Sequence, residues 1–430
     1  MSPKTFLLYF LIFSILGITC VLWFFSKNGP LSFSTAGLQL TSQLLALIGL
    51  VCISLTLVLS TKMNFIEKIL HGLDKAFYLH RILGSLGFLF ILHHPLLLAI
   101  QALPHTQSAM MYLLPGKMLS YNLGIFSLYI MLFSFIFIVF IKLPYHIWKL
   151  THQLLSLAFL LGSIHALLIT SDMSTFLPLR IWMGIFISIG IFSSFYSIFL
   201  YRYLGEQYIY VVKNIFQKNT ILDIYLEPIK HILHHEPGQF VFTSFLKNLP
   251  GGEHHPFSIS SPPESSQIRL SVKVVGDYTS KLPFLQIGDR VKLYGPYGAF
   301  AKSIKDNRPI LCIAGGIGIT PLLSIIQNET TNKSTREIVL YYLTKNSLEA
   351  VYNDELLMLA SQNPYLKIVN WYSSELGRIS IDKIENAIGS LSEYHILLCG
   401  PSKMMDEISK QAIKSGVKEE NIVFEDFAFI

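Results

Sequence analysis

Six apolar segments occupy the first 203 residues of this 430-residue chain. A helix needs about 20 apolar residues to cross the hydrocarbon core of a bilayer, and each segment is about that long or longer. Since backbone polar groups find no water in lipid, such segments fold as helices that bond their own N–H and C=O groups. We therefore predict a bundle of six transmembrane helices, over residues 5–25, 38–60, 77–102, 119–141, 151–170 and 179–202.

Composition supports a membrane protein and excludes some other classes. Hydrophobic residues make up 52% of the chain and charged residues only 14%, whereas about 25% is typical of soluble domains. The net charge of +6 is spread out, so nucleic acid is not expected as a partner. The first apolar run is long and lacks a small-x-small cleavage site, so we expect an anchor rather than a signal peptide.

Basic residues are unevenly distributed among the connections between these segments. The second and fourth connections and the stretch after the sixth segment carry more Lys and Arg than the other three. Basic loops stay on the cytoplasmic side of a membrane. We therefore expect the N-terminus and the non-membrane half to be cytoplasmic, and the protein to lie in the inner (plasma) membrane.

Two of the predicted spans each carry a pair of histidines. His80 and His94 lie in the third span, and His152 and His165 in the fifth. A spacing of 14 residues returns to within about 40° of the same helix face and separates the side chains by about 21 Å. Two such helices can hold two haems, His80 and His152 the inner and His94 and His165 the outer. The spacing of 13 overshoots the face, so we expect a distortion of the fifth helix near Gly162.

The alternative is that these histidines are interfacial or hydrogen-bonded and hold no metal. That interpretation is strongest for His152, which is close to the predicted membrane surface. Ionisable groups inside a bilayer are costly and usually functional. Two matched pairs on two spans therefore favour haem.

After residue 206 the long apolar segments end and short predicted strands begin. Short strands separated by Gly and Pro, over 207–212, 220–226, 268–274 and 289–294, predict an antiparallel barrel. From about residue 305, strands alternate with helices, which predicts a doubly wound parallel sheet. The expected fold is thus a six-helix transmembrane bundle (1–203), an antiparallel β-barrel (206–303) and a doubly wound α/β domain (304–430).

A glycine-rich turn follows the first strand of the predicted parallel sheet. The stretch 314–321 reads Ala-Gly-Gly-Ile-Gly-Ile-Thr-Pro, with an apolar strand before it and a helix after it. Glycines let the backbone approach a pyrophosphate at a helix N-terminus, where free N–H groups favour anions. We expect Gly315, Gly316, Gly318, Thr320 and Pro321 to contribute to a nucleotide site.

The segment His255-Pro256-Phe257-Ser258, which follows Pro-Gly-Gln-Phe at 237–240, resembles a motif of the ferredoxin-NADP reductase superfamily. That superfamily binds FAD through Arg-x-Tyr-Ser/Thr, and the His-Pro-Phe-Ser form is similar to the NADPH oxidase and ferric reductase branch. The resemblance implies that Phe257 covers the isoalloxazine, Ser258 approaches its N5 and His255 lies near the pyrophosphate. An aromatic face and a hydroxyl suit those positions chemically.

Further segments match the same superfamily. Residues 276–279 resemble its second FAD-phosphate segment, which implies contacts from Lys273 and Thr279. Cys399-Gly400-Pro401 resembles its third nucleotide segment, which implies that Cys399 lies near the nicotinamide. A buried strand-end cysteine is the alternative.

Two basic residues and the last aromatic residues complete the expected site. In this superfamily a basic residue placed like Lys345 reads the 2′-phosphate of NADPH; a plain surface lysine is the alternative, and Arg378 is a second candidate. A terminal aromatic stacks on the flavin, which implies that role for Phe427, favoured over Phe429. The resemblance thus makes Phe427, Cys399 and Ser258 the expected catalytic residues.

Over nearly its whole length the chain resembles NADPH oxidases and ferric reductases, and most of all bacterial homologues of the oxidases. The resemblance implies FAD, two haem b groups and NADPH or NADH, with electrons leaving to oxygen as superoxide. A ferric complex as acceptor, or delivery to a partner protein or quinone, stays open; no obligate protein partner is evident. Oxidases of the animal branch use an Arg and a His beside the outer haem, but here Leu98 stands four residues after His94 and no Arg lies near the outer end of the second segment.

Overall fold

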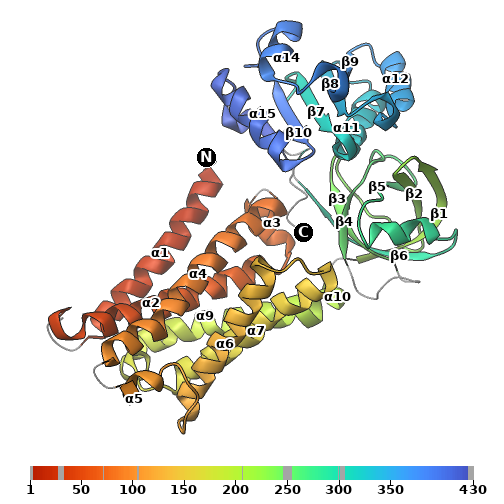
Figure 1. Ribbon diagram of the computed structural model, residues 1–430. Helices are drawn as coiled ribbons and strands as arrows, with labels where there is room; N and C mark the ends of the chain where they lie inside the picture. Colours follow the sequence, from red (N-terminus) through yellow and green to blue (C-terminus); the bar gives the residue numbers. More distant parts are fainter. Residues whose placement is uncertain are drawn as a thin grey trace. The chain divides into compact units, whose positions relative to one another are not determined.

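The structure is a computed structural model that describes residues 3–27, 33–70, 72–103, 106–205, 207–245, 254–298, 300 and 306–424. The chain divides into two compact units, residues 1–205 and 206–430. Each unit is described by itself below (Figure 1).

The first unit is helical and contains six described helices long and apolar enough to cross a membrane. In the described part of the chain, three short helices lie between them: α3 (Asn64–Leu70), α5 (Thr106–Met110) and α8 (Asp172–Thr175). A fourth, α10 (Tyr201–Leu204), follows the last long helix after a π-helical turn at Tyr196–Leu200. The prediction of six spans is therefore confirmed. The long helices are α1 (Pro3–Phe25), α2 (Phe33–Leu59), α4 (Leu73–Ala102), α6 (Leu119–Val139), α7 (Tyr145–Leu168) and α9 (Leu177–Phe195).

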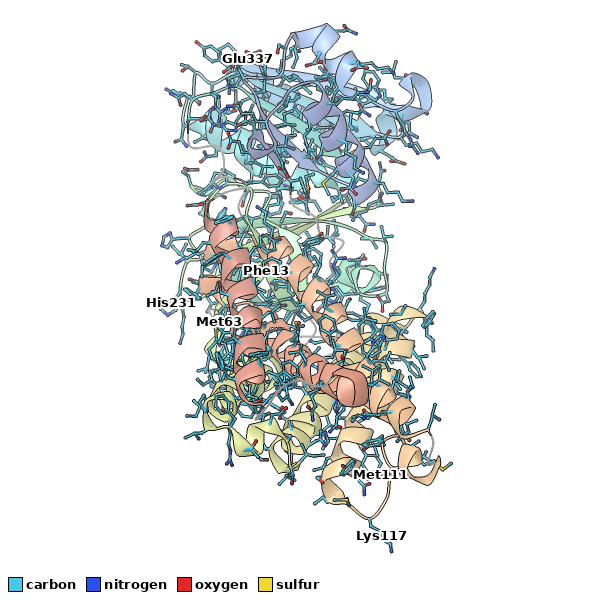
Figure 2. The ribbon with its side chains drawn as sticks, turned by 90° about the vertical axis from the view of Figure 1, so that its left-hand side faces the viewer. Phe13, Met63, Met111, Lys117, His231 and Glu337 are labelled. Atoms are coloured by element: carbon cyan, nitrogen blue, oxygen red, sulfur yellow. The ribbon has the colours of Figure 1, made fainter. Side chains whose placement is uncertain are left out.

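Large apolar side chains cover the outside of this bundle as well as its interior. Phe13 on α1 is 70% exposed, whereas Val51 and Cys52 on α2 are fully buried. A helix that is apolar all round suits lipid on one face and protein on the other. Figure 2 shows Met111 and Lys117, after α5, at one end of the bundle and Met63, after α2, toward the other end.

Helix α2 lies between α4 and α9, and α6 packs along α7. Glycines allow α2 and α4 to approach closely, because a Cβ added to Gly49 would come 2.8 Å from Ile91, and one on Gly87 would come 2.8 Å from Ile53. Small residues at such contacts are typical of helix pairs in membranes. The α2–α4 pair matters for the histidines described below.

The second unit begins with a curled antiparallel sheet. Its order is β4-β3-β6-β1-β2-β5, and an isolated bridge between Ile259 and Leu270 joins the chain after β4 to β5. Alternate residues of these strands point inward and form one buried apolar core. This is the predicted barrel, made of β1 (Gln207–Lys218), β2 (Ile221–Pro228), β3 (Phe240–Phe245), β4 (His255–Ser258), β5 (Ile268–Lys273) and β6 (Arg290–Tyr297).

The same unit continues as a five-stranded parallel sheet of order β11-β10-β7-β8-β9. Its strands are β7 (Ile310–Gly315), β8 (Ile338–Thr344), β9 (Leu366–Tyr372), β10 (His395–Cys399) and β11 (Ile422–Phe424). Its helices are α11 (Ile319–Thr331), α12 (Asn353–Gln362), α13 (Ser373–Leu376), α14 (Ile381–Ile388) and α15 (Ser402–Lys414).

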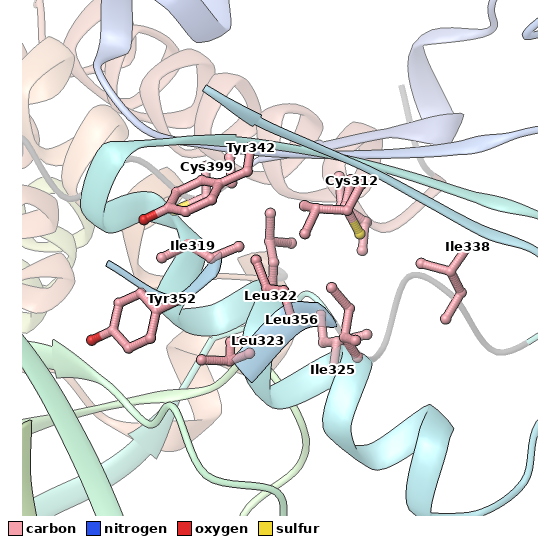
Figure 3. Close-up of a cluster of buried hydrophobic side chains, with 14 of the residues drawn as sticks. Cys312, Ile319, Leu322, Leu323, Ile325, Ile338, Tyr342, Tyr352, Leu356 and Cys399 are labelled. Carbon is pink, nitrogen blue, oxygen red and sulfur yellow. The ribbon is translucent and has the colours of Figure 1, made fainter. Parts of the chain in front are cut away.

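Helices cover both faces of this sheet, as the doubly wound prediction requires. Cys312 of β7 packs with α11 and α12 on one face (Figure 3), and its neighbour Ile313 packs with α14 and α15 on the other. Both residues are fully buried. A strand buried on both faces needs a continuous apolar sequence, which Ile310–Gly315 provides.

A buried ion pair joins the barrel to the parallel-sheet part. The guanidinium of Arg269 on β5 donates two hydrogen bonds, of 3.0 and 2.9 Å, to the carboxylate of Glu355 on α12. Nearby, Asp223 on β2 accepts hydrogen bonds from Ser271 at 2.5 Å and from Tyr352 at 2.8 Å. These contacts fix the two sheets against each other within the unit.

Candidate functional site

A cleft of about 730 Å³ lies between the barrel and the carboxyl ends of the parallel strands. This is where open α/β sheets bind ligands. The structure brings most of the predicted cofactor residues together here. The predicted residues that line it are Pro256, Phe257, Ser258, Lys273, Thr279, Gly315, Gly316, Gly318, Thr320, Lys345, Arg378, Cys399, Gly400 and Pro401.

On the barrel side, Phe257 and Ser258 end strand β4. His255, at the start of β4, does not line the cleft; its ring stacks on Tyr278, with ring centres 3.6 Å apart. The hydroxyl oxygen of Thr279 accepts hydrogen bonds from the N–H groups of Val275 and Gly276, each at 2.9 Å. The Thr279 hydroxyl therefore stabilises the loop that follows β5.

On the nucleotide side, the glycine turn runs from the end of β7 into α11. Gly316 has a φ of +56°, which an L-side chain seldom adopts. A Cβ on Gly318 would come 2.2 Å from the carbonyl oxygen of Cys399. The turn therefore packs directly against the end of β10, and Gly315, Gly316 and Gly318 line the cleft at the start of α11, an arrangement suited to a phosphate.

Two other predicted residues of this turn have local partners. The Thr320 hydroxyl donates to the carbonyl of Ile317 at 3.1 Å. Pro321 is buried in the first turn of α11 and does not line the cleft. Proline suits the start of a helix, where its missing N–H costs nothing.

Basic side chains line the outer part of the cleft. Lys345 follows β8, Arg378 follows α13, and Lys403 lies in the first turn of α15. Arg378 is 3.6 Å from Glu407, but both side chains are more than half exposed, so water screens this pair and leaves Arg378 available to a ligand.

Sequence reasoning missed Lys403 and Trp371, which also line the cleft. Lys403 stands two positions after the predicted nucleotide segment Cys399-Gly400-Pro401, and this position could have indicated a place in the cleft. The strand carrying Trp371 was not predicted. Phe427, the expected stacking aromatic, lies outside the described residues.

In the membrane unit, three of the four predicted histidines donate from Nδ1 to a backbone carbonyl. His80 donates to Thr56 at 2.9 Å, His94 to Ser42 at 3.1 Å and His165 to Ser120 at 2.6 Å. The Ser42 hydroxyl is also 2.8 Å from His94 Nδ1. A proton on Nδ1 leaves Nε2 as the atom that can bind a metal.

The inner pair of histidines is close in space. The rings of His80 and His152 have centres 5.9 Å apart and are tilted by 43°. Imidazole nitrogens lie about 2.0–2.1 Å from a bound metal, so two rings that share one have centres on the order of 6 Å apart. Nδ1 of His152 is buried and has no hydrogen-bond partner in the described part of the chain. The distance between the rings of His80 and His152 is thus close to that expected for two imidazoles on one metal.

Helix α7 carries its two histidines without a break. It is α-helical throughout Tyr145–Leu168, so the spacing of 13 residues is accommodated without an interruption at Gly162. The ring of His165 lies against Gly124 of α6, where an added Cβ would come 3.0 Å from Cε1 and Nδ1. Glycine at that position therefore makes room for the imidazole.

Three family matches cover most of the chain. Residues 45–163 match the ferric reductase like transmembrane component, residues 208–301 an FAD-binding domain and residues 312–410 the oxidoreductase NAD-binding domain. The chain has the architecture of the NADPH oxidase and ferric reductase family. The transmembrane match contains His80, His94 and His152 but ends before His165. The FAD-binding and NAD-binding matches contain the residues that line the cleft.

Curated proteins that are similar to this chain match about half of its length. Flavohemoprotein A of Dictyostelium discoideum is 29% identical over 235 residues, which cover 50% of this chain and 59% of that protein. The reductase component of propane 2-monooxygenase of Mycolicibacterium smegmatis is 26% identical over 228 residues, which cover 48% and 63%. The chain thus matches less than two thirds of the length of these relatives.

Among solved structures, a flavohemoglobin from Malassezia yamatoensis with bound FAD and heme is similar in fold. Its TM-score is 0.52 at 18% identity, over 91% of this chain and 97% of that one. The FAD/NAD-binding domain of a nitric oxide dioxygenase from Vibrio cholerae has a TM-score of 0.46 at 22% identity, over 51% and 97%.

Proposed function

We propose that this protein is a flavocytochrome b that moves electrons from cytoplasmic NAD(P)H across the inner membrane to oxygen, which leaves as superoxide. The observation that carries the proposal is the His80–His152 pair, with ring centres 5.9 Å apart, inside a helical unit that matches a ferric reductase like component. FAD converts a two-electron donor into single electrons, and haem b carries single electrons onward.

The histidines fit haem better than a bare metal ion. Among the described residues, no group of three or more His, Cys, Asp or Glu could hold a metal. Two imidazoles are too few for a structural ion, which needs about four protein ligands, whereas a porphyrin brings four nitrogens of its own. His80 and His152 would hold the inner haem through Nε2, and His94 and His165 the outer one.

The cleft residues have separate tasks in this proposal. The glycine turn before α11 would bind the pyrophosphate of the nicotinamide cofactor. Phe257 and Ser258 would place the flavin, with Cys399 beside the nicotinamide, because these residues line one cleft from opposite sides. Lys345 and Arg378 would bind a 2′-phosphate and so favour NADPH.

A ferric complex is the second candidate acceptor. It is favoured by the lack of an Arg at the outer end of α2 and by Leu98 one turn after His94, since an oxidase of the animal branch places an Arg and a His there. The two acceptors share every step up to the outer haem. Purified protein reduced anaerobically with NADPH and then given either acceptor separates them, because only an oxidase forms superoxide rapidly.

Haem content tests the proposal directly. We expect two haems per chain, and loss of one in His94→Ala or in His165→Ala, with reduction of FAD by NADPH unchanged. His93→Ala is the matched control: His93 is adjacent but exposed, and its Nδ1 donates to Leu89 within its own helix at 2.7 Å. Two haems retained in both His94→Ala and His165→Ala would exclude the ligand assignment.

A further inference from the structure

Two lysines lie just beyond the inner histidine pair. Lys62 is in the connection after α2, and Lys149 is in the first half of α7. Both side chains are only partly exposed. The Lys62 ammonium lies 5.7 Å from the centre of the buried Tyr201 ring.

Their positions along the helices associate them with His80 and His152. Lys149 precedes His152 by three residues, or about 4.5 Å of helix rise, but precedes His165 by 16 residues, or about 24 Å. Lys62 follows Thr56, whose carbonyl holds His80, by six residues. The two lysines therefore lie on the same side of this pair and far from His94 and His165.

The surroundings of Lys62 favour an anion beside it. Burial, together with the charge of Lys149, lowers the pKa of Lys62 to about 7. Lys62 also has a φ of +54°, a left-handed conformation that glycine more often takes after a helix. Strained backbone that holds a charged group in place is typical of functional positions. An anion between the two ammonium groups would relieve their repulsion.

We propose that Lys62 and Lys149 bind a propionate carboxylate of the haem held between His80 and His152. This rests on the proposed function, because that function supplies the haem. A carboxylate taken out of water needs a cationic hydrogen-bond donor. A second consequence is electrical: a cation beside a haem stabilises its reduced form, which carries the more negative charge.

Redox titration of the full-length protein in neutral phosphatidylcholine nanodiscs tests the inference. In Lys62→Gln and in Lys149→Gln, one haem should become harder to reduce, by about tenfold in its reduction equilibrium or about 59 mV for one electron. The other haem should keep its potential. The propionate-bending bands in resonance Raman spectra should shift in both variants, and Lys62→Arg should restore them.

Lys68→Gln is the matched control, because Lys68 is an exposed lysine of α3 in the same connection and the charge change is the same. It should leave both potentials unchanged. Haem is counted first in every sample: a chain without haem refutes the proposed function itself. With two haems present, unchanged potentials in both lysine variants overturn only the propionate site. A shift that appears only when phosphatidylglycerol is added shows that the lysines bind lipid phosphate, which also overturns it.

Discussion

Gly124 of α6 makes room for the imidazole of His165. The His165 ring lies 3.0 Å from the position of a Cβ on Gly124, closer than most side-chain contacts permit. Gly124→Val should displace the imidazole and reduce haem from two to one per chain, measured by absorbance of the extracted haem. Gly184→Val is the control, since nothing lies within 4 Å of a Cβ there. Equal haem content in the two variants would show that the ring can move without loss of haem.

Lys345 is the residue at which cofactor choice can be tested. A charge-assisted hydrogen bond contributes about 1.5–3 kcal/mol, or roughly tenfold or more in affinity. Lys345→Ala should therefore raise KM for NADPH about tenfold and leave KM for NADH unchanged, measured by steady-state kinetics. Lys367→Ala, an exposed lysine of β9 that does not line the cleft, should change neither. An equal effect on both cofactors contradicts a role in reading the 2′-phosphate.

Single residues were predictable where a motif fixed their surroundings. The glycine turn and His-Pro-Phe-Ser needed only local sequence, and their residues line one cleft, except His255 and Pro321. The partners of the histidines were not predictable, because Thr56, Ser42 and Ser120 belong to other helices and offer their backbone carbonyls. A carbonyl carries no sequence signal.

Elements were predicted in proportion to the strength of their patterns. The apolar spans agree with the observed helices to within about five residues, with two exceptions. α7 begins at Tyr145 rather than 151, and α9 ends at Phe195 rather than 202, where a π-helical turn follows it. The first turns of α7 contain Trp148 and Lys149, so the apolar pattern used to predict the span begins after them. Pro144, directly before the helix, was a signal for its true start. Strands β3, β4, β9 and β11 were missed. β4 and β11 are only four and three residues long, whereas β3 is buried throughout and β9 has no clear alternation, so neither of these two shows a period of two.

The α2–α4 pair provides a test at the scale of elements. α2 supplies carbonyls to both His80 and His94, and Gly87 lets the two helices approach. Gly87→Leu should separate them and reduce incorporation of both haems, whereas Gly124→Val affects one. Gly17→Leu, where a Cβ meets nothing within 4 Å, is the control. Loss of one haem alone would show that α2 does not act as a single support.

At the scale of the whole molecule, the Arg269–Glu355 pair joins the barrel to the parallel-sheet part, and the cleft lies between these two parts. Arg269 has 7% of its side chain exposed and Glu355 22%. Removing one partner of a buried ion pair costs about 3–5 kcal/mol, and the partial exposure of Glu355 favours the lower value. Glu355→Ala should therefore lower the midpoint of thermal release of FAD and raise KM for NADPH. Glu375→Ala, at an exposed site, is the control and should change neither the release midpoint nor KM for NADPH. The same result in Glu355→Ala would show that the ion pair is dispensable.

The contact of Gly318 with Cys399 also sets an order of events during synthesis. The glycine turn leaves the ribosome about 80 residues before the strand end against which it packs. Chains are made from the N-terminus, and domains fold as they emerge. A nascent chain therefore has all six spans before its nicotinamide pocket has a second wall. Until the end of β10 has been made, the chain therefore lacks a complete nucleotide cleft, and under the proposed function it could not yet take electrons from NAD(P)H.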